Sequence, residues 1–97
     1  MPIKWTDLAV ADLEKTEDTI SLENNPGVAI DVVLKIFDTV DLVLPGHPRG
    51  GPEGRVSGTR ELVVDSVPFT VVYRESNSNE LQVLRILHDT QQWPPAI

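Results

Sequence analysis

Residues 59–87 read TRELVVDSVPFTVVYRESNSNELQVLRIL, and the apolar runs in this stretch decide the fold. Three runs rich in Val, Leu, Ile and aromatic residues extend from Thr59 to Val64, from Pro68 to Glu75 and from Leu81 to Leu87. Such runs, bounded by Asp, Ser, Asn and Pro, are typical of β-strands. The links at 65–67 and 76–79 are short, and short links join antiparallel strands. The stretch therefore predicts an antiparallel three-stranded meander.

The residues before this stretch predict two helices. Thr6 is a good N-cap for the first, whose inward positions recur at helical spacing, at Ala9, Leu13, Thr16 and Ile20. Asn25 is a good N-cap for the second, and Pro26 suits its first helical position. The second helix has a wide apolar stripe, formed by Ala29, Val32, Val33, Ile36, Phe37, Val40 and Val43. The short link between the helices predicts antiparallel packing.

The predicted fold class is therefore α+β, with an N-terminal helix hairpin packed on an antiparallel β-sheet meander. Pro2 to Trp5 is short and flanked by apolar residues, so it is a candidate edge strand. The apolar residues of the strands are nearly continuous, and we expect both sheet faces to be partly covered. A chain of 97 residues allows one domain, over residues 1–97.

Composition excludes several classes of function. The net charge of −7 argues against a globally basic nucleic-acid surface, although the arginines cluster in the second half of the chain. There is no cysteine, and residues 1–6 lack the apolar core of a signal peptide. No apolar stretch approaches the ~20 residues of a membrane span. We expect a cytoplasmic protein with no membrane partner.

Motifs for cofactors and metals are also missing. The glycines at 46–58 precede a strand rather than a helix and lack the Gly-Lys-Ser/Thr of a phosphate loop. The chain has two histidines and no paired-histidine helix motif, so we expect no metal site. No Ser-His-Asp set has supporting local context. We expect no cofactor and no small-molecule substrate.

Nearly the whole chain resembles the ParE/RelE superfamily, the toxins of bacterial type II toxin–antitoxin modules. The resemblance is carried by IKWT at 3–6 with Ala9, Asp12 and Leu13, NP at 25–26, GRVSGTRELVV at 54–64, PFTVVYR at 68–74 and VLRILHDTQQWP at 83–94. It implies the same helix hairpin on an antiparallel sheet. It also implies a cognate antitoxin that folds a segment onto the toxin and holds it inactive.

The superfamily holds two activities, and the resemblance leaves both open. ParE-like members poison DNA gyrase, whereas RelE-like members cleave mRNA on the ribosome. Cleavage needs an acid, a base and cations around the phosphate. Arg60, Arg74 and His88 are the candidate catalytic residues for that reaction, but Thr70 stands where RelE-type members tend to place an arginine. The acidic chain would also dock poorly on a ribosome.

We therefore favour the gyrase type, which is not an enzyme. A ribosome-dependent endoribonuclease, with ribosome and mRNA as partners, is the alternative. A third alternative is an inactive family member that only binds its partner.

Four further residues are candidates for binding a target or partner: Arg49 and Arg55 in the glycine-rich loop at 47–58, Arg85, and Trp93. Each has a structural alternative. The loop could be a plain connector, and Trp93 could anchor the tail by packing. Arg74 and Arg85 could form a basic patch on adjacent strands, or could lie on a solvated strand face.

Three strand residues also have structural alternatives. Arg60 could form a salt bridge with Glu61 or Glu75, or could be a surface strand residue. His88 could be a strand-end histidine that positions the tail, rather than an acid or base. Tyr73 alternates with apolar neighbours on its strand, which favours the core.

Overall fold

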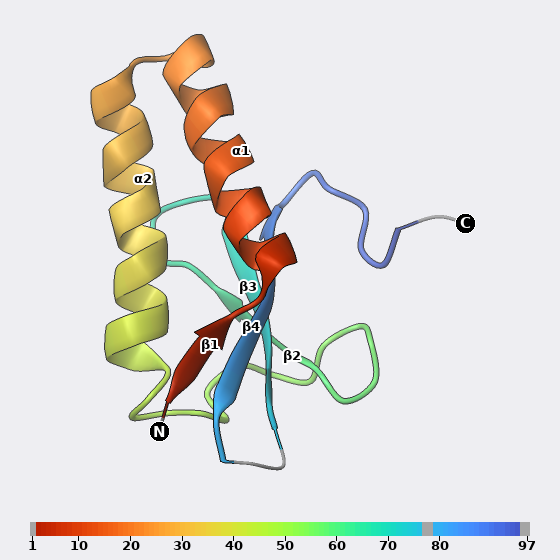
Figure 1. The fold of residues 1–97 in the computed structure, drawn as a ribbon. Helices are drawn as coiled ribbons and strands as arrows, with labels where there is room; N and C mark the ends of the chain where they lie inside the picture. Colours follow the sequence, from red (N-terminus) through yellow and green to blue (C-terminus); the bar gives the residue numbers. More distant parts are fainter. Residues whose placement is uncertain (1, 77–78, 96–97) are drawn as a thin grey trace.

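The computed structural model describes residues 2–76 and 79–95. Within them the chain forms seven elements in this order: β1 (Ile3–Trp5), α1 (Asp7–Glu23), α2 (Pro26–Asp38), the π-helical turn η1 (Thr39–Val43), β2 (Arg60–Val63), β3 (Phe69–Glu75) and β4 (Leu81–His88). The two long helices stand side by side as a hairpin against one face of the sheet (Figure 1). The predicted α+β class is confirmed.

Both helices begin where the sequence predicted. The Thr6 hydroxyl accepts a hydrogen bond from the Ala9 amide, and the Asn25 side chain accepts one from the Val28 amide. Pro26 occupies the first turn of α2, where its missing N–H leaves no bond unmade. Asn24 and Asn25 separate the helices, so α2 returns antiparallel to α1.

The sheet has the strand order β1-β4-β3-β2 within the described residues. The predicted meander is confirmed, because β2 pairs antiparallel with β3 and β3 pairs antiparallel with β4. The candidate edge strand is also confirmed, but β1 runs parallel to β4 and makes the sheet mixed. The predicted turn at 76–79 is described only in part, since residues 77–78 lie outside the described residues.

The core lies between the helix hairpin and one sheet face. Its central side chains come from α2 and η1 on one side and the middle strands on the other, and include Ile36, Val40, Val71, Tyr73 and Val83. The first five residues of β3 are all buried, so both faces of this strand are covered, as the continuous apolar pattern predicted. Phe37 and Val43, at the margins of the predicted stripe, remain exposed.

Candidate functional site

Arg60 supports the loop that precedes it. The residue lies opposite Tyr73 in the pairing of β2 with β3. Its Nη1 donates to the Gly51 carbonyl at 2.8 Å, while the Gly51 amide donates to the Tyr73 hydroxyl at 3.0 Å. A Cβ at Gly51 would meet the Glu61 carbonyl oxygen at 2.9 Å, so only glycine fits between these groups. One alternative considered for Arg60, a salt bridge with Glu61 or Glu75, is not formed among the described residues, where Glu61 pairs with Arg55 and Glu75 with Arg49.

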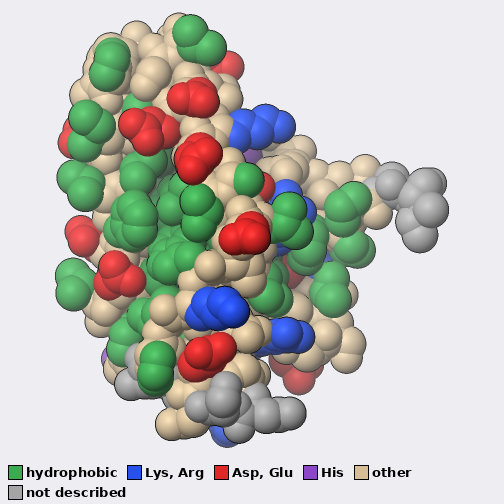
Figure 2. All heavy atoms as spheres, viewed as in Figure 1, with side chains coloured by type: hydrophobic (Ala, Val, Ile, Leu, Met, Phe, Trp, Pro, Cys, Tyr) green, Lys and Arg blue, Asp and Glu red, His purple; other side chains and the backbone are tan. Residues whose placement is uncertain are grey.

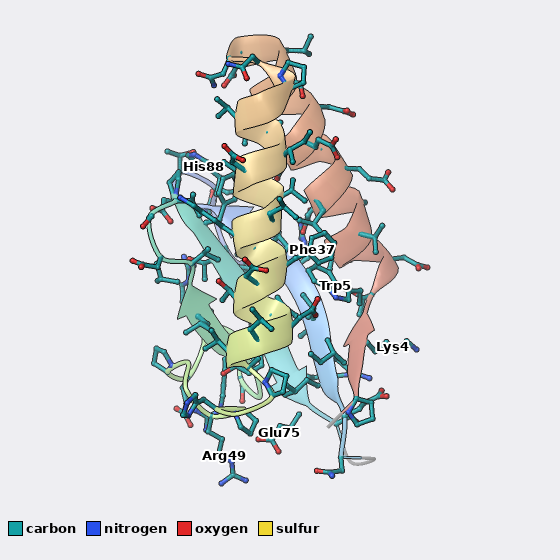
Figure 3. All side chains as sticks on the ribbon, turned by 90° about the vertical axis from the view of Figure 1, so that its left-hand side faces the viewer. Lys4, Trp5, Phe37, Arg49, Glu75 and His88 are labelled. Atoms are coloured by element: carbon teal, nitrogen blue, oxygen red, sulfur yellow. The ribbon has the colours of Figure 1, made fainter. Side chains whose placement is uncertain are left out.

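Arg49 and Arg55 hold the two halves of the glycine-rich loop against the sheet. Arg49 Nε lies 3.3 Å from a carboxylate oxygen of Glu75, and Figure 3 shows the two side chains together at one end of the molecule. The Arg55 guanidinium donates to both oxygens of Glu61, at 2.8 Å and 3.3 Å, and the Arg55 amide donates to the same carboxylate at 2.7 Å. These two contacts add to the hydrogen bonds that hold the loop at Gly51.

The Arg55–Glu61 contact shifts the pKa of both groups. Hydrogen bonds from the Arg55 side chain and amide stabilise the Glu61 carboxylate and lower its pKa below the ordinary value, although its partial burial acts in the opposite direction. The same hydrogen bond raises the pKa of Arg55. Both groups are charged near neutral pH, so neither is suited to exchange a proton there.

Arg74 and Arg85 do not form the basic patch considered from the sequence. Arg74 lies opposite Gln82 and donates to its side-chain oxygen at 2.7 Å, whereas Arg85 lies opposite Val72. A β-bulge between Val72 and Tyr73 shifts the register between the two arginines. Arg85 is also neutralised by Asp12, so the two guanidinium groups do not offer one free cationic surface.

Asp12 is the site residue that sequence reasoning missed. Its carboxylate accepts from Arg85 Nε at 2.8 Å, from Arg85 Nη2 at 3.1 Å and from the Ile86 amide at 2.9 Å. The hydrogen bonds to Asp12 raise the pKa of Arg85. A signal was present in the sequence, because Asp12 precedes buried Leu13 and stands four residues before Thr16, on the inward side of α1.

The same carboxylate completes the edge of β4. The strand β1 pairs only with Leu81–Val83, so the following amides and carbonyls have no strand beside them. The Thr6 hydroxyl donates to the Val83 carbonyl at 2.8 Å, and Asp12, six residues further along the chain, accepts from the Ile86 amide at 2.9 Å. The first turns of α1 thus replace a strand at this edge.

Trp93 packs on the domain as an anchor. Its ring lies beneath the Arg85 guanidinium, with 5.5 Å from the guanidinium carbon to the ring centroid. This is a cation–π contact, and it attaches the C-terminal tail to the Asp12–Arg85 pair. Its Nε1 is buried and makes no hydrogen bond within the described residues.

His88 ends β4 and positions the start of the tail. Its Nδ1 lies 2.7 Å from the Thr90 hydroxyl, and its ring packs edge-on against Phe69 with 5.2 Å between centroids. His88 also lines a cavity of about 650 Å³ between the ends of both helices and the sheet, together with Lys15, Ile20, Val32 and Arg85.

The structure does not bring the three candidate catalytic residues together. Arg60 lies opposite Tyr73 and His88 opposite Phe69, which are four residues apart on β3 and so separated by roughly 13 Å. Arg74 alternates with Tyr73 and points to the other sheet face. Figure 3 shows His88 at the end of the sheet opposite Arg49 and Glu75.

The described ranges 2–76 and 79–95 lack two other classes of site. They contain no group of three or more His, Asp or Glu side chains placed to hold a metal ion. None of their helices has both the length and the apolar character needed to cross a membrane.

Known proteins resemble this chain in both sequence and fold. A sequence profile of the family described as the ParE toxin of type II toxin–antitoxin system, parDE, matches residues 3–93. Y4kP of Sinorhizobium fredii, a protein named as a candidate toxin, is 35% identical over 95 residues, which cover 98% of this chain and 95% of that protein.

Two solved structures share the fold. A chain of the chromosomal ParDE toxin–antitoxin system of P. aeruginosa matches with a TM-score of 0.82 and 31% identity, over 91% of this chain and 95% of that one. A chain of the RelBE2 toxin–antitoxin complex of Mycobacterium tuberculosis matches with a TM-score of 0.64 and 19% identity, over 90% of this chain and 95% of that one. The second likeness concerns the fold alone.

Proposed function

This chain belongs to the ParE toxin family of type II toxin–antitoxin systems, and we propose that it inhibits DNA gyrase until a cognate antitoxin neutralises it. The observation that carries the gyrase assignment is the dispersal of Arg60, Arg74 and His88 over two faces and two ends of the sheet. The greater likeness to the ParDE chain than to the RelBE2 chain supports the same choice.

The chemistry of RNA cleavage fits this arrangement poorly. Attack by a 2′-hydroxyl requires a base, an acid and several cations within contact of one phosphate. Arg60 donates to a backbone carbonyl, Arg85 is paired with Asp12, and β2, β3 and β4 contain no lysine. A toxin that acts by binding a protein target needs no such convergence.

The proposed antitoxin is supported by the matching family and by the ParDE relative, whose names describe toxin–antitoxin systems. The cavity of about 650 Å³ beside His88 is a candidate place for part of such a partner, since it combines Ile20 and Val32 with Lys15. A partner bound only to the folded toxin would raise its apparent stability by mass action. Gyrase and a cognate antitoxin would both meet the protein in the cytoplasm, so we propose a cytoplasmic location.

The test is a gyrase supercoiling assay with purified, antitoxin-free protein, ATP and plasmid DNA. We expect supercoiling to stop and linear, enzyme-linked DNA to accumulate. The variants Arg60→Ala and His88→Ala should inhibit as well as the wild type, once circular dichroism shows that they are folded. Purified antitoxin, mixed with the protein before gyrase is added, should leave supercoiling intact.

Three other results would redirect the assignment. An unaffected gyrase reaction with folded protein would refute the proposal. Cleavage of mRNA on translating ribosomes, lost in Arg60→Ala and His88→Ala, would establish the ribosome-dependent nuclease instead. Harmless overexpression without antitoxin would identify an inactive member that only binds its partner.

A further inference from the structure

The cavity beside His88 has apolar walls on two sides. Its volume of about 650 Å³ lies in the range of pockets that hold small molecules. One wall comes from α1 and the first turns of α2, and the other from the start of β3, the end of β4 and the first residues of the tail. The apolar side chains of these walls include Ile20, Val28, Val32, Phe69 and Ile86. Phe69 and Ile86 belong to the core, so the sheet side of the cavity is fixed in place.

Three side chains bring nitrogen donors without acceptors to the same cavity. The Lys15 ammonium makes no ion pair and no hydrogen bond within the described part of the chain. Arg85 uses Nε and Nη2 for Asp12, and its Nη1 has no partner there. The Thr90 amide donates to His88 Nδ1 at 3.1 Å, so the neutral ring carries its proton on Nε2, which is also without an acceptor among the described residues. The lining is therefore rich in donors and short of acceptors for them.

The carboxylates of the lining do not satisfy these donors. Asp12 is already shared by Arg85 and the Ile86 amide. Glu23 stands eight residues after Lys15 on α1, which places it about 12 Å further along the helix. In Figure 2, acidic side chains are spread over the helices, whereas a histidine and a basic side chain lie together to the right of α1. The cavity thus has a cationic end, and its acidic end lies at the tip of the hairpin.

This polarity decides the class of ligand. A carboxylate suits the cationic end, because its two oxygens can accept from both Lys15 and His88. Its single charge is also repelled less than a phosphate dianion by a chain of net charge −7. The apolar walls favour a hydrocarbon body, since its burial removes apolar surface from water. The spacing of Lys15 and Glu23 limits that body to about 12 Å, the length of a straight chain of about ten carbons.

We propose that the cavity beside His88 binds a small amphiphile with one carboxylate head and a short apolar body. The head lies between Lys15 and His88, and the body lies against Ile20, Val28 and Phe69. An antitoxin segment in the same cavity would displace the ligand. The inference does not rest on gyrase inhibition, because binding is measured on the antitoxin-free chain whether or not gyrase is the target.

The probe is decanoate, and the matched probe is decyltrimethylammonium, which has the same alkyl chain and a cationic head. Each is titrated below its micelle concentration into the isotope-labelled full chain, and two-dimensional amide NMR spectra give both the affinity and the place of binding. Decanoate should bind with a Kd of about 0.1–1 mM and at least about fivefold more tightly than the cationic probe. The net charge of −7 alone would produce the opposite preference, so the comparison separates the cavity from the overall charge.

Two pairs of variants locate the head and the body of the ligand. Lys15→Gln removes the cation and should weaken decanoate at least about fivefold, whereas Lys35→Gln, the same change on α2 outside the lining, should leave affinity within about twofold. Val28→Asp places a carboxylate beside the body and should also weaken decanoate at least about fivefold, whereas Ile30→Asp, on the same helix outside the lining, should not. All four positions are exposed, so the circular dichroism spectra should match that of the wild type.

Three outcomes would overturn the proposal. The first is no saturable binding of decanoate below its micelle concentration, or binding no tighter than that of the cationic probe. The second is unchanged decanoate affinity in Lys15→Gln or in Val28→Asp. The third is a set of amide shifts centred on Ile30 and the outer face of α2, which would show that the alkyl chain binds exposed apolar surface instead of the cavity.

Discussion

Replacing Asp12 with alanine removes one carboxylate that accepts three hydrogen bonds. Two of them come from Arg85 and one from the Ile86 amide, so the change leaves a guanidinium and a strand-edge amide without their acceptor. Removing one partner of a fully buried ion pair costs about 3–5 kcal/mol. The Asp12 and Arg85 side chains are 14% and 19% exposed, so water will replace part of the loss.

Alanine has a higher helix propensity than aspartate, and this offsets up to about 0.7 kcal/mol of the lost stability. We therefore expect Asp12→Ala to lower the free energy of unfolding by about 2–3 kcal/mol. For a chain of this size, the melting temperature should fall by about 8–24 °C. The tail should loosen too, because Trp93 packs on the Arg85 guanidinium that Asp12 orients.

The assay is urea unfolding of Asp12→Ala, Arg85→Ala and the double variant, which together give the coupling energy of the pair. The control is Asp12→Asn, which retains an acceptor for the Ile86 amide and removes the charge. Its free energy of unfolding should lie between those of wild type and Asp12→Ala. A loss below about 0.5 kcal/mol in Asp12→Ala, or a coupling near zero, would refute the reasoning.

Three smaller perturbations test other contacts. Tyr73→Phe leaves the buried Gly51 amide without its acceptor and should cost about 1–3 kcal/mol in urea unfolding, and an unchanged midpoint would show that the loop is held otherwise. Thr6→Val removes the N-cap of α1 and should cost about 1–2 kcal/mol by the same measurement. Unaltered stability would show that the cap does not stabilise the protein. Glu61→Gln should destabilise the protein at neutral pH only. The pKa of Glu61 is lower in the folded chain, so its contribution is complete above the unfolded value of about 4.3 and disappears as pH falls through the folded value. The difference in unfolding free energy between wild type and Glu61→Gln should therefore be largest at pH 7 and should shrink as the pH is lowered below about 4. A constant difference would exclude the Arg55 contact as its cause.

The elements of the fold were predictable because their signals are local. A cap at Thr6, a cap at Asn25 and a proline at position 26 fix where the helices begin. Apolar runs separated by short polar links fix three strands and their antiparallel order. The parallel pairing of β1 with β4 had no such signal, since it joins Ile3 to Leu81 across most of the chain.

The roles of the arginines were not predictable in the same way. The sequence offered Arg60 a salt bridge with Glu61 or Glu75, but those carboxylates bind Arg55 and Arg49. The basic patch of Arg74 and Arg85 depended on register, and the bulge beside Tyr73 changed that register. Whether His88 meets another catalytic group depends on which end of the sheet it occupies, and alternation alone does not say this.

The sequence by itself determined the fold class, the helix caps, the strand order of the meander and the family. Periodicity, capping and turn chemistry act over a few residues and can be recognised in the chain. Only the tertiary structure decided which charges neutralise each other, which loop is anchored and which apolar side chains stay exposed. Those outcomes rest on contacts such as that of Asp12 with Arg85, 73 residues apart, which form only after the helix hairpin has packed on the sheet.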